Sequence, residues 1–149
     1  MSAKQFKHKS FGVRISGEMF GSTMLQANGN RMAQDMNDMA SMCRALNDRW
    51  WRNPKTGRLK KRNRLEMLML IVTELAEGAE GERKDIMDNH LPHRKMAEVE
   101  LADAVIRIFD YAAGHGYDLG GAVVEKCQYN LTRADHSKAA RLAPGGKKC

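Results

Sequence analysis

The sequence predicts an all-α protein, and three observations favour that fold class. Apolar residues recur three or four positions apart over several long stretches, which is the spacing of one face of an α-helix. Eleven methionines, which favour helices and fill irregular cores, replace much of the aromatic filling, because aromatic residues make up only 6% of the chain. There are only three prolines, and β-branched residues are sparse outside short stretches. We therefore expect a compact bundle of four helices with short connections, completed by oligomerisation.

The length of 149 residues fits one domain with one core. Residues 1–29 are basic near the start and rich in glycine and serine, without a sustained helical period, so we expect a partly extended arm. Residues 30–140 carry the helical patterns and form the expected helical domain. Residues 141–149 contain Pro144, two glycines and two lysines, and are expected to form a basic tail.

Four helices are expected between residues 30 and 133. An apolar stripe predicts a first helix from about residue 30 to residue 50, with that stripe in the core; its members are Met32, Met36, Met39, Cys43 and Leu46. Proline, glycine and a run of charges then predict a loop over residues 52–63. The remaining helices are expected at 63–84, 94–114 and 119–133.

The net charge of +7 indicates an anionic partner, either nucleic acid or a phosphorylated small molecule. No stretch approaches the roughly 20 apolar residues of a membrane span. The basic N-terminal stretch is not followed by an apolar segment, so we expect no signal peptide. Three cysteines, far apart and odd in number, indicate reduced thiols. We expect a cytoplasmic protein without membrane contact, in the host cytoplasm if the protein is viral.

Two glutamates on the second expected helix follow a strongly apolar run. At about 100° per residue, Glu74 and Glu77 lie about 60° apart around the helix axis. Met67 and Leu70 project close to the direction of Glu74. These carboxylates therefore lie inside or at the edge of the apolar surface, and not on an opposite polar face.

The third expected helix carries a second acidic pair at the same spacing. Glu100 and Asp103 lie one turn apart, and Arg107 and Asp110 continue the same side of the helix. The opposite side is apolar and is expected to face the core. It comprises Ala102, Val105, Ile106, Phe109 and Ala113.

The two acidic pairs have two interpretations. Four carboxylates close together repel one another and raise one another's pKa unless cations lie among them, and Mg²⁺ or Mn²⁺ would satisfy that need with oxygen ligands. Alternatively, Asp103 pairs with Arg107 four residues later, while Glu74 and Glu77 line a wet groove. Spacing alone leaves both interpretations open.

A resemblance to a known family bears on this choice. The segments "LMLIVTELAEGAEGERK", "LPHRKMAEVELADAVIRIFDYA" and "EKCQYNLTRADH", with a closing "GGKK", together resemble the MazG-like all-α nucleoside triphosphate pyrophosphohydrolases. The resemblance covers about residues 60–148. The metal signature of that family is Glu-x-x-Glu followed by Glu-x-x-Asp, which Glu74, Glu77, Glu100 and Asp103 match.

The resemblance implies an activity, a cofactor and an assembly. Such enzymes cleave nucleoside triphosphates between the α and β phosphates, use Mg²⁺ or Mn²⁺, and form dimers or tetramers. We expect two or three ions per site, and a purine deoxynucleotide such as dGTP or dATP as substrate, as in viral members of the family. Glu74 and Glu77 are equal candidates for the general base.

Further residues are candidates for substrate contact. Lys126, Asn130 and Arg133 lie on one face of the fourth expected helix and match a Lys-x-x-x-Asn-x-x-Arg block of the family, which implies phosphate binding. A solvated basic stripe is the alternative. Trp50 and Trp51 adjoin the basic loop, and we take Trp51 as the candidate that stacks on the base; packing or an oligomer contact is the alternative.

A different class of protein also fits the charge. A basic helical nucleic-acid-binding protein without catalysis would explain the basic arm and the sequence pI near 9.5. The sequence contains no recognisable base-reading module, and the acidic cluster would repel a phosphate backbone. We therefore expect a nucleotide partner and not a nucleic acid.

Overall fold

The computed structural model of the chain describes residues 17–147. In this part of the chain the fold is α-helical, which confirms the predicted all-α class. The helices, two of them short 3₁₀ helices labelled η, are α1 (Gly17–Leu46), η1 (Asp48–Trp51), α2 (Arg64–Lys84), α3 (Met96–Gly114), α4 (Leu119–Thr132), η2 (Ala134–His136) and α5 (Lys138–Leu142). None of the helices within residues 17–147 combines the length and hydropathy of a membrane span.

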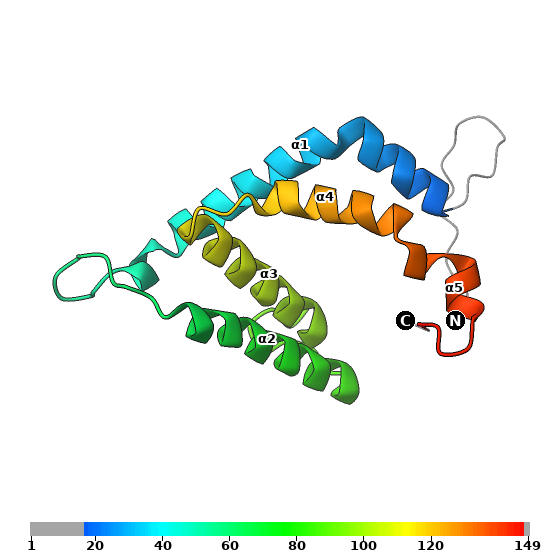
Figure 1. The fold of residues 1–149 in the computed structure, drawn as a ribbon. Coiled ribbons are helices and arrows are strands. Elements are labelled where there is room, and N and C mark those ends of the chain that lie inside the picture. The colour runs from blue at the N-terminus through cyan, green and yellow to red at the C-terminus, as the bar shows by residue number, and fades with distance from the viewer. Residues whose placement is uncertain (1–16, 148–149) are drawn as a thin grey trace.

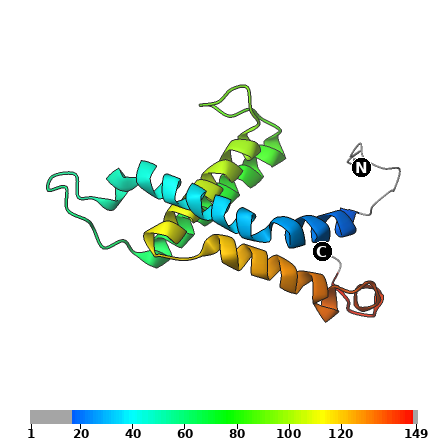
Figure 2. The same cartoon turned by 90° about the horizontal axis from the view of Figure 1, so that it is seen from above.

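The four long helices form two antiparallel pairs (Figure 1). α2 and α3 make a helical hairpin, and α4 runs back along α1. α3 also packs against α1, so that the spatial order is α2, α3, α1, α4. Figure 2 shows the same two pairs from above, with the α2–α3 hairpin crossing the direction of α1 and α4. One chain therefore forms an open arrangement in which α2 packs mainly on α3 and α4 mainly on α1.

α1 begins well before the predicted start at residue 30. Its first half, from Gly17 to Gly29, is helical, so the expectation of an extended arm is wrong for these residues. Leu25 and Gly29 are buried, and a Cβ on Gly29 would lie 3.2 Å from Cγ1 of Val124 in α4. Packing on α4 thus stabilises a segment whose glycines disfavour helix formation. The remainder of the expected arm, residues 1–16, lies outside the described residues.

The expected apolar stripe of α1 is buried only in part. Cys43, a member of that stripe, is buried, whereas Met32, Met39 and Leu46 are exposed. The buried side is completed by Ala40, which does not belong to the stripe. Small side chains face α3 and α4 because they allow close approach between helices, and the larger methionines are left outside.

The contact between α1 and α4 depends on Asn37, whose side-chain amide donates to Oδ1 of Asp118 at 2.7 Å. The amide oxygen of Asn37 accepts from the backbone N–H of Gly120 at 2.9 Å. A Cβ on Gly120 would lie 2.1 Å from the carbonyl oxygen of Ala33, so only glycine permits this approach. Beyond the other end of α4, the short helix α5 extends to Leu142, so it includes the first two residues of the tail that was expected over residues 141–149.

The buried side of α3 is the acidic one, opposite to our prediction. Glu100 and Asp110 are buried together with Ala104, while Val105 and Ile106 are exposed. α2 and α1 cover the acidic and small residues of α3, and within residues 17–147 no helix covers Val105 and Ile106 on its apolar side. The predicted apolar core of α3 is therefore a surface of the protomer.

Candidate metal centre

Glu74 belongs to the buried face of α2. Met67, Ile71, Glu74, Gly78 and Gly81 recur at intervals of four and three residues, and all five are buried. A carboxylate thus occupies a position whose neighbours one turn away are apolar or have no side chain. The expectation that Glu74 lies inside the apolar surface is confirmed by its 7% exposure.

Two glycines on this face bring α3 close to α2. A Cβ on Gly78 would lie 3.4 Å from the Cβ of Glu100, and one on Gly81 would lie 2.9 Å from the backbone nitrogen of Ala97. At Gly81 a larger residue would force the helices apart, because such a separation is shorter than real Cβ contacts. The glycines therefore place Glu100 beside the acidic pair of α2.

Three of the four predicted carboxylates converge. One oxygen from each of Glu74, Glu77 and Glu100 lies within 4.8 Å of the others. Glu74 and Glu100 are buried, and Glu77 is exposed at the edge of the group. The arrangement offers oxygen atoms from two rigid helices on one side of a hairpin. Asp103 is exposed and does not belong to this group of three.

Burial raises the pKa of the Glu100 carboxyl above its ordinary value. The charge of Glu77 raises the pKa further, as do a hydrogen bond with Glu74, the charge of Glu74, and the charge of Asp103. Asp103 is therefore close enough to act electrostatically on the group. Burial, and then the neighbouring carboxylates, therefore both favour the protonated form of Glu100.

A guanidinium lies at the edge of the cluster. Nε and Nη2 of Arg107 are each 2.6 Å from Oε1 of Glu74. The alternative derived from the sequence paired Arg107 with Asp103, but the ion pair observed joins α3 to α2 across the hairpin. Arg107 thus supplies positive charge to the acidic group from within the chain.

The predicted phosphate-binding residues lie elsewhere in the chain. α4 packs along α1, and Figure 1 shows the end of α4 directed toward α5 and away from the α2–α3 hairpin. Nζ of Lys126 lies 4.6 Å from the ring centroid of Tyr129, and Nε of Arg133 lies 2.6 Å from Oδ1 of Asp135. Oδ1 of Asn130 is buried and has no hydrogen-bond partner among residues 17–147. Lys126 and Asn130 therefore lie on α4 and Arg133 directly after it, apart from the carboxylates of α2 and α3 in the same chain.

Trp51 is a core residue and not an open stacking surface. Its indole N–H donates to both carboxylate oxygens of Asp110, at 2.9 and 3.1 Å. The guanidinium of Arg44 lies 4.5 Å from the ring centroid, and only 7% of the residue is exposed. Trp51 is therefore largely covered between α1 and α3, and only a small part of it lines a second cavity, beside Arg62 and His115. This low exposure argues against the predicted role in base stacking.

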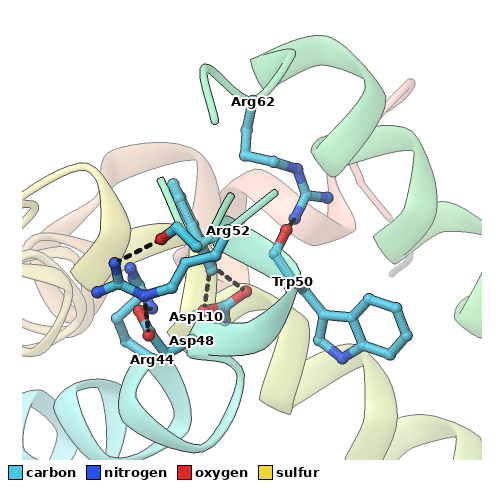
Figure 3. Close-up of polar contacts among 8 residues, drawn as sticks. Arg44, Asp48, Trp50, Arg52, Arg62 and Asp110 are labelled. Atoms are coloured by element: carbon cyan, nitrogen blue, oxygen red, sulfur yellow. Dashed lines mark hydrogen bonds and ion pairs between the residues drawn. The ribbon is translucent and has the colours of Figure 1, made fainter. Parts of the chain in front are cut away.

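Trp50 has the opposite environment, with 58% of the residue exposed. Figure 3 shows its indole directed away from the cluster formed by Arg44, Asp48, Arg52 and Asp110. Nη1 of Arg62 donates to the backbone carbonyl of Trp50 at 3.1 Å, which holds the backbone while the ring stays open. The sequence offered no physical reason for choosing Trp51 over Trp50 as the stacking residue, because the two are adjacent in the same short helix.

An open cavity of about 510 Å³ adjoins the acidic cluster. It lies between α2, α3 and the segment that includes η1. Its lining residues are Asn47, Trp50, Lys60, Arg62, Glu66, Met67, Leu70, Asp103, Ile106, Arg107 and Asp110. Asp103 and Arg107 thus border the cavity on the side of the carboxylate cluster.

Gly78 and Gly81, on which the approach of the two helices depends, were not among the residues predicted from the sequence. Their positions continue the spacing of Met67, Ile71 and Glu74, and this continuation is the signal that could have identified them. Comparisons of the chain with protein-family models, with curated proteins and with solved structures found no match. The resemblance to a family therefore rests on the sequence motifs alone.

Proposed function

We propose that the protein is a MazG-like (d)NTP pyrophosphohydrolase. In this proposal the substrate is a purine deoxynucleoside triphosphate such as dGTP or dATP, and the products are the monophosphate and pyrophosphate. The single observation that carries the proposal is the convergence of Glu74, Glu77 and Glu100, with oxygens within 4.8 Å on two packed helices. A buried carboxylate pair costs stability, and a bound cation would offset that cost.

The donor set fits Mg²⁺ or Mn²⁺. Both ions prefer carboxylate oxygens and retain water and phosphate ligands, and the group of three offers carboxylates beside Arg107, which lines an open cavity and is paired with Glu74. Asp103 borders that cavity and acts electrostatically on Glu100, so it is the fourth proposed ligand. We propose two or three ions per site. When bound, such ions polarise phosphoryl oxygens and lower the pKa of water.

The residues of the chain have distinct proposed roles. Glu74 and Glu77 are the candidates to accept the proton of the attacking water, because they lie on the rigid face of α2. Arg107 neutralises part of the negative charge of the cluster through its ion pair with Glu74. Lys126, Asn130 and Arg133 are the proposed phosphate contacts.

Lys126, Asn130 and Arg133 lie apart from the acidic cluster of their own chain. A second copy of the chain could bring its own phosphate-binding residues to that cluster if it packed on exposed apolar side chains of α2 and α3. On α2 these are Leu65, Leu68, Met69, Val72 and Leu75, and on α3 they are Leu101, Val105 and Ile108. The spacing of three and four residues forms a continuous apolar face that needs a partner. We propose that a homodimer or homotetramer covers it and completes the site with α4 residues.

A product assay tests the activity. With Mg²⁺ or Mn²⁺, dNTPs should yield monophosphate and pyrophosphate, and a chelator should stop the reaction. Glu100→Gln and Asp103→Asn should abolish turnover while circular dichroism retains the helical signal. Glu82→Gln, an exposed glutamate on the same α2 helix, is the matched control and should keep activity. Release of orthophosphate from the γ position, or activity in the Glu100→Gln variant, would contradict the proposal.

A second candidate function has one specific observation in its favour. Lys55, Arg58, Lys60 and Lys61 are exposed in the loop between η1 and α2, which is a concentration of positive charge. A basic nucleic-acid-binding protein would use such a loop for phosphate contacts. Binding to DNA or RNA that weakens steeply with salt, without nucleotide turnover, would favour this candidate over the enzyme.

A further inference from the structure

The cavity beside the acidic cluster has a lining that suits an uncharged group. Three cationic side chains, Lys60, Arg62 and Arg107, are matched by three carboxylates, Glu66, Asp103 and Asp110. This balance does not favour a polyphosphate, which needs a clear excess of positive charge. The cavity volume of about 510 Å³ lies in the range of small-ligand sites.

The walls of the cavity are apolar and aromatic. Met67 and Leu70 of α2 and Ile106 of α3 line it, and Trp50 lines it from the η1 side. A flat ligand with an apolar face and polar edges matches such walls, since aromatic side chains stack on nucleobases. Asn47 adds an amide that makes no capping hydrogen bond with η1 and can both donate and accept.

The cavity lies where a substrate of the proposed activity would extend. Asp103 and Arg107 border both the cavity and the carboxylate cluster, so phosphates held at the cluster would place the rest of a nucleotide in the cavity. Residues 47–51 lie outside the sequence blocks that resemble a known family. The assignment of this segment therefore depends on the geometry of this chain alone.

We propose that this cavity binds the nucleoside part of the substrate, with Trp50 stacking on the base and Asn47 contacting the base edge. This inference rests on the proposed pyrophosphohydrolase function. Trp51, one residue later, is excluded from the role because its indole is enclosed and bonded to Asp110. The guanidinium of Arg49 lies 5.4 Å from the ring centroid of Trp50, and Trp50 nevertheless remains largely exposed.

The test compares ligands with and without a nucleoside. Isothermal titration with Mg²⁺ measures the Kd of α,β-methylene dGTP and α,β-methylene dATP, which resist cleavage at the α–β bond, and of tripolyphosphate. Trp50→Ala should weaken binding of the nucleotide analogues by about five- to a hundredfold, the range for losing one stacking partner. The same variant should leave tripolyphosphate binding unchanged, and Trp50→Phe should restore most of the nucleotide affinity.

Controls separate this inference from the proposed function. Leu59→Ala removes an exposed apolar residue of the neighbouring loop that does not line the cavity, and it should change neither Kd. Trp50→Ala binding the nucleotide analogues as tightly as wild type would overturn the inference and leave the pyrophosphohydrolase intact. Equal weakening of all ligands, or a changed oligomer mass in Trp50→Ala, would instead assign Trp50 to subunit contact. A wild-type protein that binds no ligand would overturn both proposals.

Discussion

Two guanidinium nitrogens of Arg107 lie 2.6 Å from the same carboxylate oxygen of Glu74, and this ion pair joins α3 to α2. Glu74 is buried and Arg107 is half-exposed, so the carboxylate would lose its counter-charge if the arginine were removed. Removing one partner of such a pair leaves a buried charge uncompensated. Arg107 therefore stabilises the acidic cluster when no metal ion is present.

We predict that Arg107→Gln lowers the free energy of unfolding by about 1–2 kcal/mol in a chelator, after allowance for the partial exposure of the arginine. Mn²⁺ should recover most of this loss, because the cation supplies the missing positive charge. Urea unfolding with chelator and with Mn²⁺ measures both effects. Equal destabilisation under the two conditions would contradict the prediction.

Arg83→Gln is the matched control. Arg83 also bonds a glutamate of α2, with Nε 2.7 Å from Oε2 of Glu80, but both side chains are exposed. The hydrogen bonds from Arg83 and Lys84 lower the pKa of the Glu80 carboxyl to about 2. Exposed pairs contribute little to stability, so this variant should unfold like wild type with or without Mn²⁺.

Gly81→Ala should separate α2 from α3 at the metal centre. The added Cβ would lie 2.9 Å from the backbone nitrogen of Ala97, and backbone atoms cannot move aside cheaply. We expect a loss of about 1–3 kcal/mol of stability and weaker Mn²⁺ binding. The control is Gly21→Ala in α1, where no atom lies within 4 Å of the new Cβ. That change should stabilise the helix by about 0.5–1 kcal/mol.

Asp110→Asn tests a pH dependence. Burial raises the pKa of the Asp110 carboxyl, although the hydrogen bond from Trp51 and the charges of Arg44, Arg62 and His115 oppose this shift. The folded protein therefore retains a proton at pH values where the unfolded chain has released it. Its free energy of unfolding falls as pH rises above about 4, until the folded-state pKa is passed.

Asparagine cannot release a proton, and its amide oxygen can still accept from the indole of Trp51. The stability of Asp110→Asn relative to wild type should therefore increase as pH rises through this range. Urea unfolding at a series of pH values measures the difference between the two proteins. A difference that stays constant with pH would show that Asp110 is not the titrating group.

Periodicity predicted α2, α3 and α4 to within one or two residues of their ends, because each has a continuous pattern and a clear boundary. Asn63 caps α2 by accepting from Leu65 and Glu66, and Asp118 caps α4 by accepting from Gly121. Spacing also placed Glu74 and Glu77 one turn apart on α2, and Glu100 on the same side of α3 as Asp103, although it left open whether the two pairs converge. These features depend on local sequence.

The features that the sequence did not predict depend on which helices meet. The first half of α1 has a weak apolar pattern, and its burial against α4 decides its conformation. The predicted buried side of α3 was the wrong one, because an apolar pattern does not distinguish a helix face in the core of the chain from a face that contacts another molecule. Similarly, nothing local separates Trp50 from Trp51, because the buried environment of Trp51 includes its bond to Asp110, 59 residues further along the chain.

Trp51→Ala should damage folding and not recognition. The indole packs beside His115, with ring centroids 5.6 Å apart, and a Cβ on Gly114 would lie 2.3 Å from the Trp51 ring. Loss of a buried tryptophan costs about 3–5 kcal/mol, and here it also leaves the Asp110 carboxylate without its indole donor. We therefore expect a much lower Tm, whereas the exposed Trp50→Ala should melt near wild type.

Trp51→Phe separates packing from hydrogen bonding, because phenylalanine fills most of the space but offers no N–H to Asp110. It should recover part of the lost Tm, and below its Tm it should bind α,β-methylene dGTP as wild type does. Thermal melts followed by circular dichroism, with titrations at a temperature where each variant is folded, measure the two properties separately. Normal stability with weakened nucleotide binding in Trp51→Phe would transfer the stacking role from Trp50 to Trp51. The burial of Trp51 and the exposure of Trp50 predict the reverse, since a base can stack only on a ring that it can reach.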